Sequence, residues 1–264
     1  MSESHKAFGD RHALAVFFVL AYALSWWPWI WTIASPETSP STILPCGPFF
    51  AAVIVLAILG RNHLMDFLKG IVRWRIAPRW YAVALLLPLL VTIVAVLVNI
   101  GLGAEPLGSF EAPGLYSLLA KFIFVFVLIG LGEEPAWRGF ALPRLLVGLS
   151  PIMASAVLGI LHMFWHLPLL GVEYDMQSVV PWAIGLMGYT IVVTWMYMNS
   201  GGSVLLPALM HSAVNTSAFF FQMFNGAELI RLWWLFAILW ALAAVAVVLV
   251  YGPSLKVQRQ APAV

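Results

Sequence analysis

The 264-residue sequence contains very little charge. It holds 13 Lys and Arg and 11 Asp and Glu, so that 9% of its residues are charged, against roughly 25% in an ordinary soluble domain. Apolar residues make up 62% of the chain, which is more than a single hydrophobic core could hide from water. The composition therefore excludes a water-soluble globule and indicates a protein embedded in lipid.

Other scarcities exclude further classes of protein. A single cysteine, Cys46, excludes a disulfide scaffold, and the absence of polar tracts excludes a disordered chain. With a formal net charge of only +2, we expect no nucleic-acid partner. No internal repeat is visible, and we interpret residues 1–264 as a single membrane domain.

Eight apolar runs approach the roughly 20 residues that cross a bilayer as a helix. Because lipid offers no hydrogen-bonding partner to the backbone, runs of this length are expected to be helices. The sequence thus predicts an all-α, polytopic integral membrane protein with about eight transmembrane helices. The runs are 13–33, 43–59, 80–102, 115–131, 152–170, 179–198, 203–224 and 232–251.

The basic residues predict the orientation of these spans. Eight spans place both termini on one side, and that side collects 11 of the 13 basic residues. The positive-inside rule makes it the cytoplasm, so both termini are predicted to be cytoplasmic, in the plasma membrane. These basic residues are Lys6, Arg11, Arg61, Lys69, Arg73, Arg75, Arg79, Arg138, Arg144, Lys256 and Arg259.

One long polar connection, residues 61–80, joins the second and third runs. Its apolar residues recur at helical spacing beside basic ones, as in a helix that lies in the headgroup layer. A basic loop that follows the positive-inside rule is the other interpretation, and we favour it.

Polar groups within the spans carry most of the functional information. An ionisable group at mid-bilayer costs on the order of 3 kcal/mol, so such groups usually face a protein interior or a water-filled cavity. Three sets stand out: Glu133, Glu134 and Arg138 in the fourth run, His162 and His166 in the fifth, and His211 and Asn215 in the seventh.

Helical spacing predicts which of these groups can meet. Glu134 and Arg138 are four residues apart and can form an ion pair on one helix face. Glu133 points about 100° away, which leaves it free to act as a general base. Alternatively, both glutamates are solvated at a helix end. His211 and Asn215 also share a face, suited to stabilising an oxyanion or, alternatively, to bonding between helices.

The depth of Glu133 in the membrane limits where the helix of the fourth span can end. If it ended at residue 131, Glu133 would lie at the surface and His166 roughly 22 Å deeper, too far apart to share a water molecule. We therefore expect the helix to continue through Arg138 to about residue 142.

The two histidines of the fifth run share a face as well. We expect His162 to make a structural hydrogen bond. A zinc ion is an open alternative, with His166 and His211 as ligands and Glu133 nearby. No HExxH motif is present, so no cofactor is required by the pattern.

At these residues the sequence resembles the CAAX prenyl protease and bacteriocin-processing family of intramembrane proteases. Three ordered motifs carry the resemblance: EExxxR at 133–138, a histidine motif that ends at His166, and HxxxN at 211–215. They lie in a candidate catalytic core of about residues 115–225. The family usually has an aromatic residue four positions before the motif histidine, where this chain has His162.

The resemblance implies an intramembrane endopeptidase whose active site opens to the cytoplasm. It implies that Glu133 is the base for the hydrolytic water and His166 its partner. His211 and Asn215 would stabilise the oxyanion, with Glu134 and Arg138 as a supporting pair. The implied partner is a peptide or protein substrate, lipidated or not.

Two other functions fit the same residues. Buried glutamate and histidine side chains also serve proton relays in ion-coupled transporters, although the chain shows no repeated halves. A non-catalytic membrane adaptor could use the same polar cluster only to hold its helices together.

Overall fold

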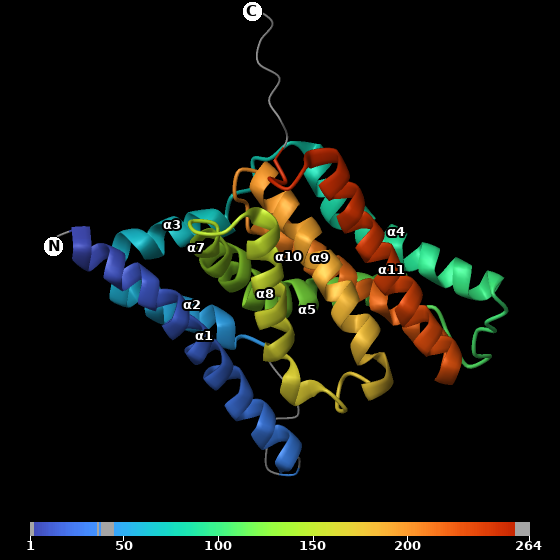
Figure 1. The fold of residues 1–264 in the computed structure, drawn as a ribbon. Helices are drawn as coiled ribbons and strands as arrows, with labels where there is room; N and C mark the ends of the chain where they lie inside the picture. Colours follow the sequence, from blue (N-terminus) through green and yellow to red (C-terminus); the bar gives the residue numbers. More distant parts are fainter. Residues whose placement is uncertain (1–2, 36, 38–44, 257–264) are drawn as a thin grey trace, which may run out of the picture.

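The computed structural model describes residues 3–35, 37 and 45–256, and this part of the chain folds as helices joined by turns (Figure 1). Its only β-type contact is an isolated bridge between Leu170 and Tyr174, which confirms the all-α prediction. The helices are α1 (Glu3–Ala34), α2 (Gly47–Leu59), α3 (Arg61–Ile71), α4 (Pro78–Gly101), α5 (Leu115–Val125), α6 (Leu131–Glu134), α7 (Leu142–Leu145), α8 (Pro151–Trp165), α9 (Val179–Asn199), α10 (Leu205–Ser217) and α11 (Gly226–Tyr251).

Among the described residues, five helical stretches are long and apolar enough to cross a membrane. They are His12–Ala34, Pro78–Gly101, Leu115–Leu145, Met176–Asn199 and Gly226–Tyr251. The other three predicted runs contain the shorter helices α2, α8 and α10, of 13, 15 and 13 residues. Residues 43–44 of the second run lie outside the described residues. The protein is thus polytopic, while the count of eight spans stays a prediction.

The fourth span continues as one helical stretch to Leu145, as the depth constraint predicts. Two π-helical segments interrupt it, η1 (Phe126–Gly130) and η2 (Pro135–Ala141), on either side of α6. Pro135 has no N–H, and its ring crowds the carbonyl one turn earlier, so the wider π turn after Glu134 has a local cause. Such π turns are frequent at functional sites.

Two glycines in this span allow neighbouring helices to approach closely. A Cβ at Gly130 would lie 2.8 Å from the carbonyl oxygen of Ala208 in α10. A Cβ at Gly132 would lie 3.3 Å from the Cys46 sulfur, just before α2. These contacts bring α10 and the start of α2 against the segment that carries the two glutamates.

One predicted helix end and one predicted loop are wrong. The fifth run was expected to reach residue 170, but α8 ends at Trp165 and Leu167–Leu169 form a 3₁₀ turn, because Pro168 has no N–H to donate to the carbonyl one α-helical turn earlier. Residues 61–71, for which a loop is the favoured interpretation, form α3 instead. Phe67 of α3 is buried and contacts the position of Gly139 in η2, so packing supports this helix.

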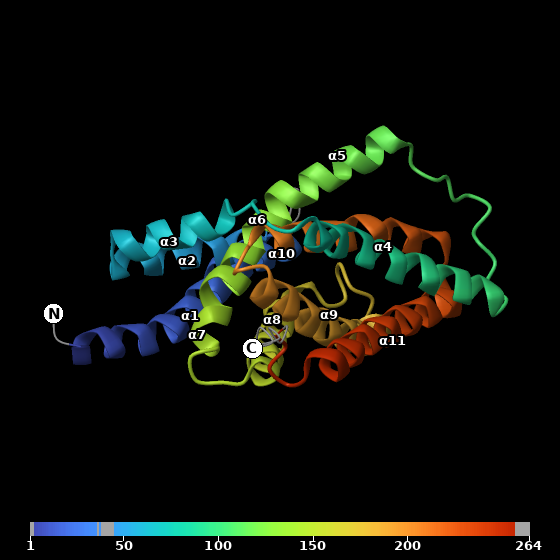
Figure 2. The same cartoon turned by 90° about the horizontal axis from the view of Figure 1, so that it is seen from above.

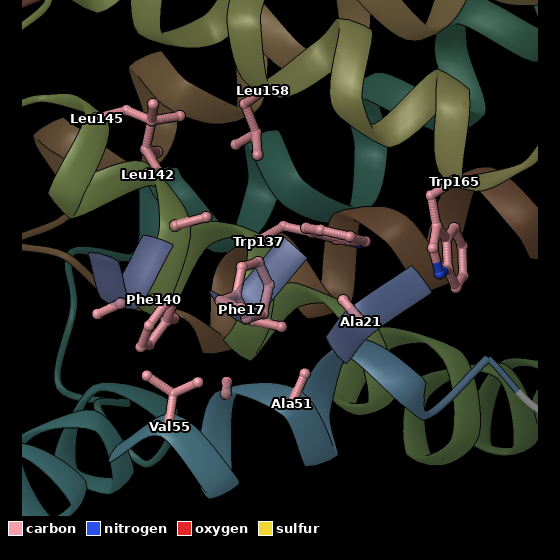
Figure 3. Packing of buried hydrophobic residues seen from close by; sticks show 14 of the residues in the cluster. Phe17, Ala21, Ala51, Val55, Trp137, Phe140, Leu142, Leu145, Leu158 and Trp165 are labelled. Atoms are coloured by element: carbon pink, nitrogen blue, oxygen red, sulfur yellow. The ribbon is translucent and has the colours of Figure 1, made fainter. Parts of the chain in front are cut away.

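Aromatic packing fixes η2 within the bundle. The Phe17 ring of α1 lies 4.7 Å from Phe140 and 5.7 Å from Trp137, measured between ring centroids, and Figure 3 shows these side chains together with Ala51 and Val55 of α2. A second cluster joins α4, α9, α10 and α11. Figure 2 shows α5 leaning away from the rest of the bundle. The glutamates therefore stand on the firmly packed half of their span.

Candidate functional site

Glu133 is almost completely buried at the end of α6, with 2% of its surface exposed. Its Oε2 atom accepts a hydrogen bond from Trp137 Nε1 at 3.2 Å and lies 3.1 Å from His162 Nε2. None of the hydrogen bonds among the described residues uses Oε1. Glu133 thus has one oxygen that is held by donors and one that is free to contact another group.

Glu134 has different partners, although it is the next residue. Its Oε1 atom accepts from Arg138 at 2.9 Å and lies 2.8 Å from His211 Nδ1, and both Glu134 and Arg138 are fully buried. The contact predicted between Glu134 and Arg138 is present. The Arg138 guanidinium also lies 5.7 Å from the Tyr189 ring centroid, which adds a cation–π contact.

His166 follows the last residue of α8 and is held through its own helix. Its Nδ1 atom lies 2.9 Å from the carbonyl oxygen of His162. Because a carbonyl oxygen only accepts, Nδ1 carries the proton and Nε2 of the neutral ring carries the lone pair. The ring does not hydrogen-bond Glu133 among the described contacts; His162 takes that place.

A cavity of about 720 Å³ brings the candidate residues together. Helices of the fourth, fifth and seventh predicted runs all contribute to its wall, so the polar groups of these runs face a common space. Aromatic side chains, including Trp165, Trp182 and Trp240, form much of the remaining lining. The candidate site residues that line it are Glu133, His162, His166, His211 and Asn215.

Comparison with known proteins shows what this part of the chain is similar to. Residues 115–217 match the family described as type II CAAX prenyl endopeptidase Rce1-like. The chain is also 26% identical over 182 residues to CAAX prenyl protease 2 of Methanococcus maripaludis, and the match covers 64% of this chain and 67% of that relative. Residues 115–217, called the Rce1-like region below, are therefore similar to this family.

All of the candidate site residues lie within this Rce1-like region. It begins at α5 and ends with α10. The predicted resemblance is thus confirmed at the level of the family, and the several apolar helices make the chain an integral membrane protein. The role of each site residue is a separate question.

The cavity is bordered by the loop between α8 and α9 and by the segment between α10 and α11. The C-terminal ends of α9 and α11 lie at the top of Figure 1, whereas the loop after α8 lies at the bottom. Of the exposed residues that line the cavity, Glu173 lies in the loop after α8 and Gln222 in the segment after α10. The loop that borders the cavity thus lies at the end of the bundle away from the C-terminal end of α11 (Figure 1), while the orientation of the termini and the side to which the site opens stay predictions.

Glu173 stands in the loop between α8 and α9, outside the membrane-spanning segments. Partial burial and the negative charge of Glu133 both raise the pKa of the Glu173 carboxyl above its usual value. The electrostatic influence of Glu133 therefore reaches the rim of the cavity.

Two residues of the site were missed in the sequence. Trp137 is four residues after Glu133, so the same spacing that pairs Glu134 with Arg138 could have revealed it. Tyr189 of α9, which lines the cavity, carries no comparable signal, because only the fold brings α9 to this place.

The described residues do not fit a zinc site as they stand. No group of three His, Cys, Asp or Glu side chains among them lies close enough together to hold a metal ion, whereas catalytic zinc commonly has three protein ligands. We therefore derive no step through a metal.

Proposed function

We propose that this chain is an intramembrane endopeptidase in which Glu133 activates a water molecule. The observation that carries the proposal is that the two oxygens of the Glu133 carboxylate have different surroundings. Oε2 is held by Trp137 and His162, while Oε1 has no bond among the described residues. A carboxylate oxygen that borders a cavity can accept a proton from a bound water.

His166 is proposed to hold the same water. Its Nε2 lone pair, left free by the bond at Nδ1, can accept the second hydrogen of the water molecule. Transfer of one water proton to Glu133 then lets the oxygen attack the scissile carbonyl carbon. Glu133 returns this proton to the leaving amine nitrogen as the carbon–nitrogen bond breaks, so that protons and charge balance.

His211 and Asn215 are proposed to stabilise the oxyanion of the tetrahedral intermediate. Glu134 accepts from His211 Nδ1, which orients the ring, and a protonated Nε2 can then donate into the cavity. The Asn215 amide borders the same cavity one helical turn away. Donors that are already oriented in a water-poor site are worth about 3–4 kcal/mol each in the transition state.

We propose that the substrate is a peptide with an apolar segment at the cleavage site. The aromatic wall of the cavity suits an apolar segment, and the related archaeal protein is named a CAAX prenyl protease. A prenylated peptide that ends in a CAAX sequence is thus the first substrate to test, beside the same peptide without its prenyl group. The proposal requires no cofactor, so chelators should leave cleavage unchanged.

The test is cleavage of these internally quenched peptides by the full-length protein in lipid nanodiscs. Wild type should cleave the prenylated peptide, the unmodified peptide or both, and Glu133→Gln should cleave neither while keeping the wild-type melting temperature. Cleavage by Glu133→Gln would contradict the proposal. Glu133-dependent solute uptake without any cleavage would favour a transporter, and a lower melting temperature without any wild-type cleavage would favour an adaptor.

We propose that the termini face the cytoplasm, as the basic residues predict, and that the cavity therefore opens at the opposite face. Cysteines introduced at Asn62 and Gln177, in a Cys46→Ala background, place one exposed thiol at each end of the bundle. In intact cells an impermeant maleimide should label Gln177→Cys and spare Asn62→Cys. The reverse labelling would restore a site that opens to the cytoplasm.

A further inference from the structure

His162 has a position that the motifs do not explain. It is 2% exposed, and its Nε2 atom lies 3.1 Å from Oε2 of Glu133. Trp137, the second donor to that oxygen, belongs to the same helical stretch as Glu133. His162 is therefore the donor that ties Glu133 to a different helix, α8.

The tautomer of His162 follows from its surroundings. An ionised carboxylate only accepts hydrogen bonds, so Nε2 must carry the proton. The Nδ1 atom is buried and has no hydrogen-bond partner among the described residues, which suits a bare lone pair better than a second N–H. His162 is thus a neutral ring with one donor, and that donor points at Glu133.

Aromatic neighbours hold the His162 ring in place. Its centroid lies 5.0 Å from that of Trp137 and 5.7 Å from that of Trp165. A ring packed between two indoles has little freedom to turn. The direction of its N–H bond is therefore set by packing before any substrate arrives.

The backbone of His162 has a second, separate contact. Its carbonyl oxygen accepts the Nδ1 proton of His166. One residue thus orients the glutamate through its side chain and the neighbouring histidine through its main chain. A change of the His162 side chain leaves this main-chain contact in place. Because the rings of His162 and His166 also lie 4.9 Å apart, the variants must differ in the donor to Glu133 while keeping a side chain of similar size.

We propose that His162 is a positioning residue, which holds Oε2 of Glu133 so that Oε1 is presented to the hydrolytic water. This inference rests on the proposed function. Without the donor from α8, the carboxylate keeps only Trp137 and can turn about its last side-chain bond. The reacting atoms are then aligned less often, which lowers the rate of the chemical step more than it lowers substrate binding.

Three variants separate the hydrogen bond from the shape of the side chain. In His162→Gln the amide nitrogen takes the place of Nε2, so the donor to Glu133 is kept. In His162→Asn the amide nitrogen takes the place of Nδ1, which has the same chemistry at the wrong position. In His162→Phe the ring is kept and the donor is lost.

The experiment is steady-state cleavage of the quenched peptides in nanodiscs, with a melting temperature for each variant. We expect His162→Gln to keep kcat within about threefold of wild type, whereas His162→Asn and His162→Phe lose roughly tenfold or more. KM should stay within about twofold in all three. A merely structural role would lower melting temperature and would not separate Gln from Asn.

Three outcomes overturn the inference. The first is a wild-type kcat in His162→Phe and His162→Asn, and the second is a kcat in His162→Gln as low as that in His162→Asn. In both cases, loss of cleavage in Glu133→Gln would leave the proposed function standing. The third is cleavage by Glu133→Gln itself, which overturns the proposed function and this inference together.

Discussion

Two adjacent glutamates have different surroundings in this protein. Glu133 borders the cavity, and its partners are the neutral donors Trp137 and His162. Glu134 is enclosed and has the cationic Arg138 and the imidazole of His211 as partners. A rotation of about 100° per residue is enough to send one carboxylate toward the cavity and the other into the packing between α6, η2 and α10.

The different partners of Glu133 and Glu134 show that burial alone does not identify a catalytic carboxylate. Both residues are almost fully buried, but a glutamate in an ion pair stabilises the fold by satisfying the charge of its partner. A glutamate with neutral donors on one oxygen keeps its other oxygen available for chemistry. We therefore expect changes around Glu134 to affect stability first and changes around Glu133 to affect rate first.

Removal of Arg138 should have the largest effect on stability. In Arg138→Met the enclosed Glu134 loses its cationic partner, and breaking one partner of a buried ion pair costs about 3–5 kcal/mol. The melting temperature, followed by circular dichroism in detergent, should fall by several degrees.

The exposed pair of Lys69 and Asp66 provides the matched control. Its two atoms also lie 2.9 Å apart, but the side chains are 68% and 75% exposed, and the pKa of Asp66 is lowered by its bond to Lys69. Lys69→Met should change the melting temperature by no more than about 1 °C. If Arg138→Met and Lys69→Met lowered the melting temperature equally, burial of the Glu134–Arg138 pair would not make it more important for stability than the exposed pair.

A change of Trp137 should have a smaller effect than a change of Arg138, and this effect should be on the cleavage rate. Trp137→Phe keeps an aromatic ring beside Phe17 and Phe18 but removes one of the two donors to Glu133. We expect kcat to fall by roughly tenfold with little change in melting temperature. Trp195→Phe is the control, because the buried Trp195 indole N–H has no partner among the described residues. Equal kcat values in the two variants would contradict a role for the bond to Glu133.

The smallest effect is expected at the rim of the cavity. The pKa of Glu173 is raised because its carboxyl ionises less readily in the folded state than in the unfolded state. The folded state therefore loses stability as the pH rises from 4.5 through the raised pKa of Glu173. At pH 7, Glu173→Gln should raise the melting temperature by about 1–2 °C, and at pH 4 it should change nothing. In a Glu133→Gln background the gain should shrink, because one cause of the shift is removed. An undiminished gain would show that Glu133 carries no charge.

The sequence predicts those features that depend on one helix at a time. Hydropathy located the helical segments, and the requirement that Glu133 and His166 share a water molecule predicted the continuation of the fourth span beyond Arg138. The spacing of Glu134 and Arg138 predicted their contact. Hydropathy and the Glu134–Arg138 spacing need only the periodicity of a single helix, whereas the continuation of the fourth span also used the expected meeting of Glu133 and His166.

Features that depend on two helices could not be predicted. The bonds from His162 to Glu133 and from His211 to Glu134 span 29 and 77 residues, and no local pattern encodes which histidine meets which glutamate. The sequence therefore indicated the polar groups of the site without their pairing.

The most direct test is a parallel measurement of single-turnover cleavage and melting temperature for Glu133→Gln and Glu134→Gln. Glu133→Gln should lose about 10²–10⁴-fold in cleavage rate while melting like wild type. Glu134→Gln should melt several degrees lower and retain measurable cleavage below its melting temperature. The opposite pattern, with Glu133→Gln unstable but active and Glu134→Gln stable but inactive, would contradict the assignment of the two glutamates.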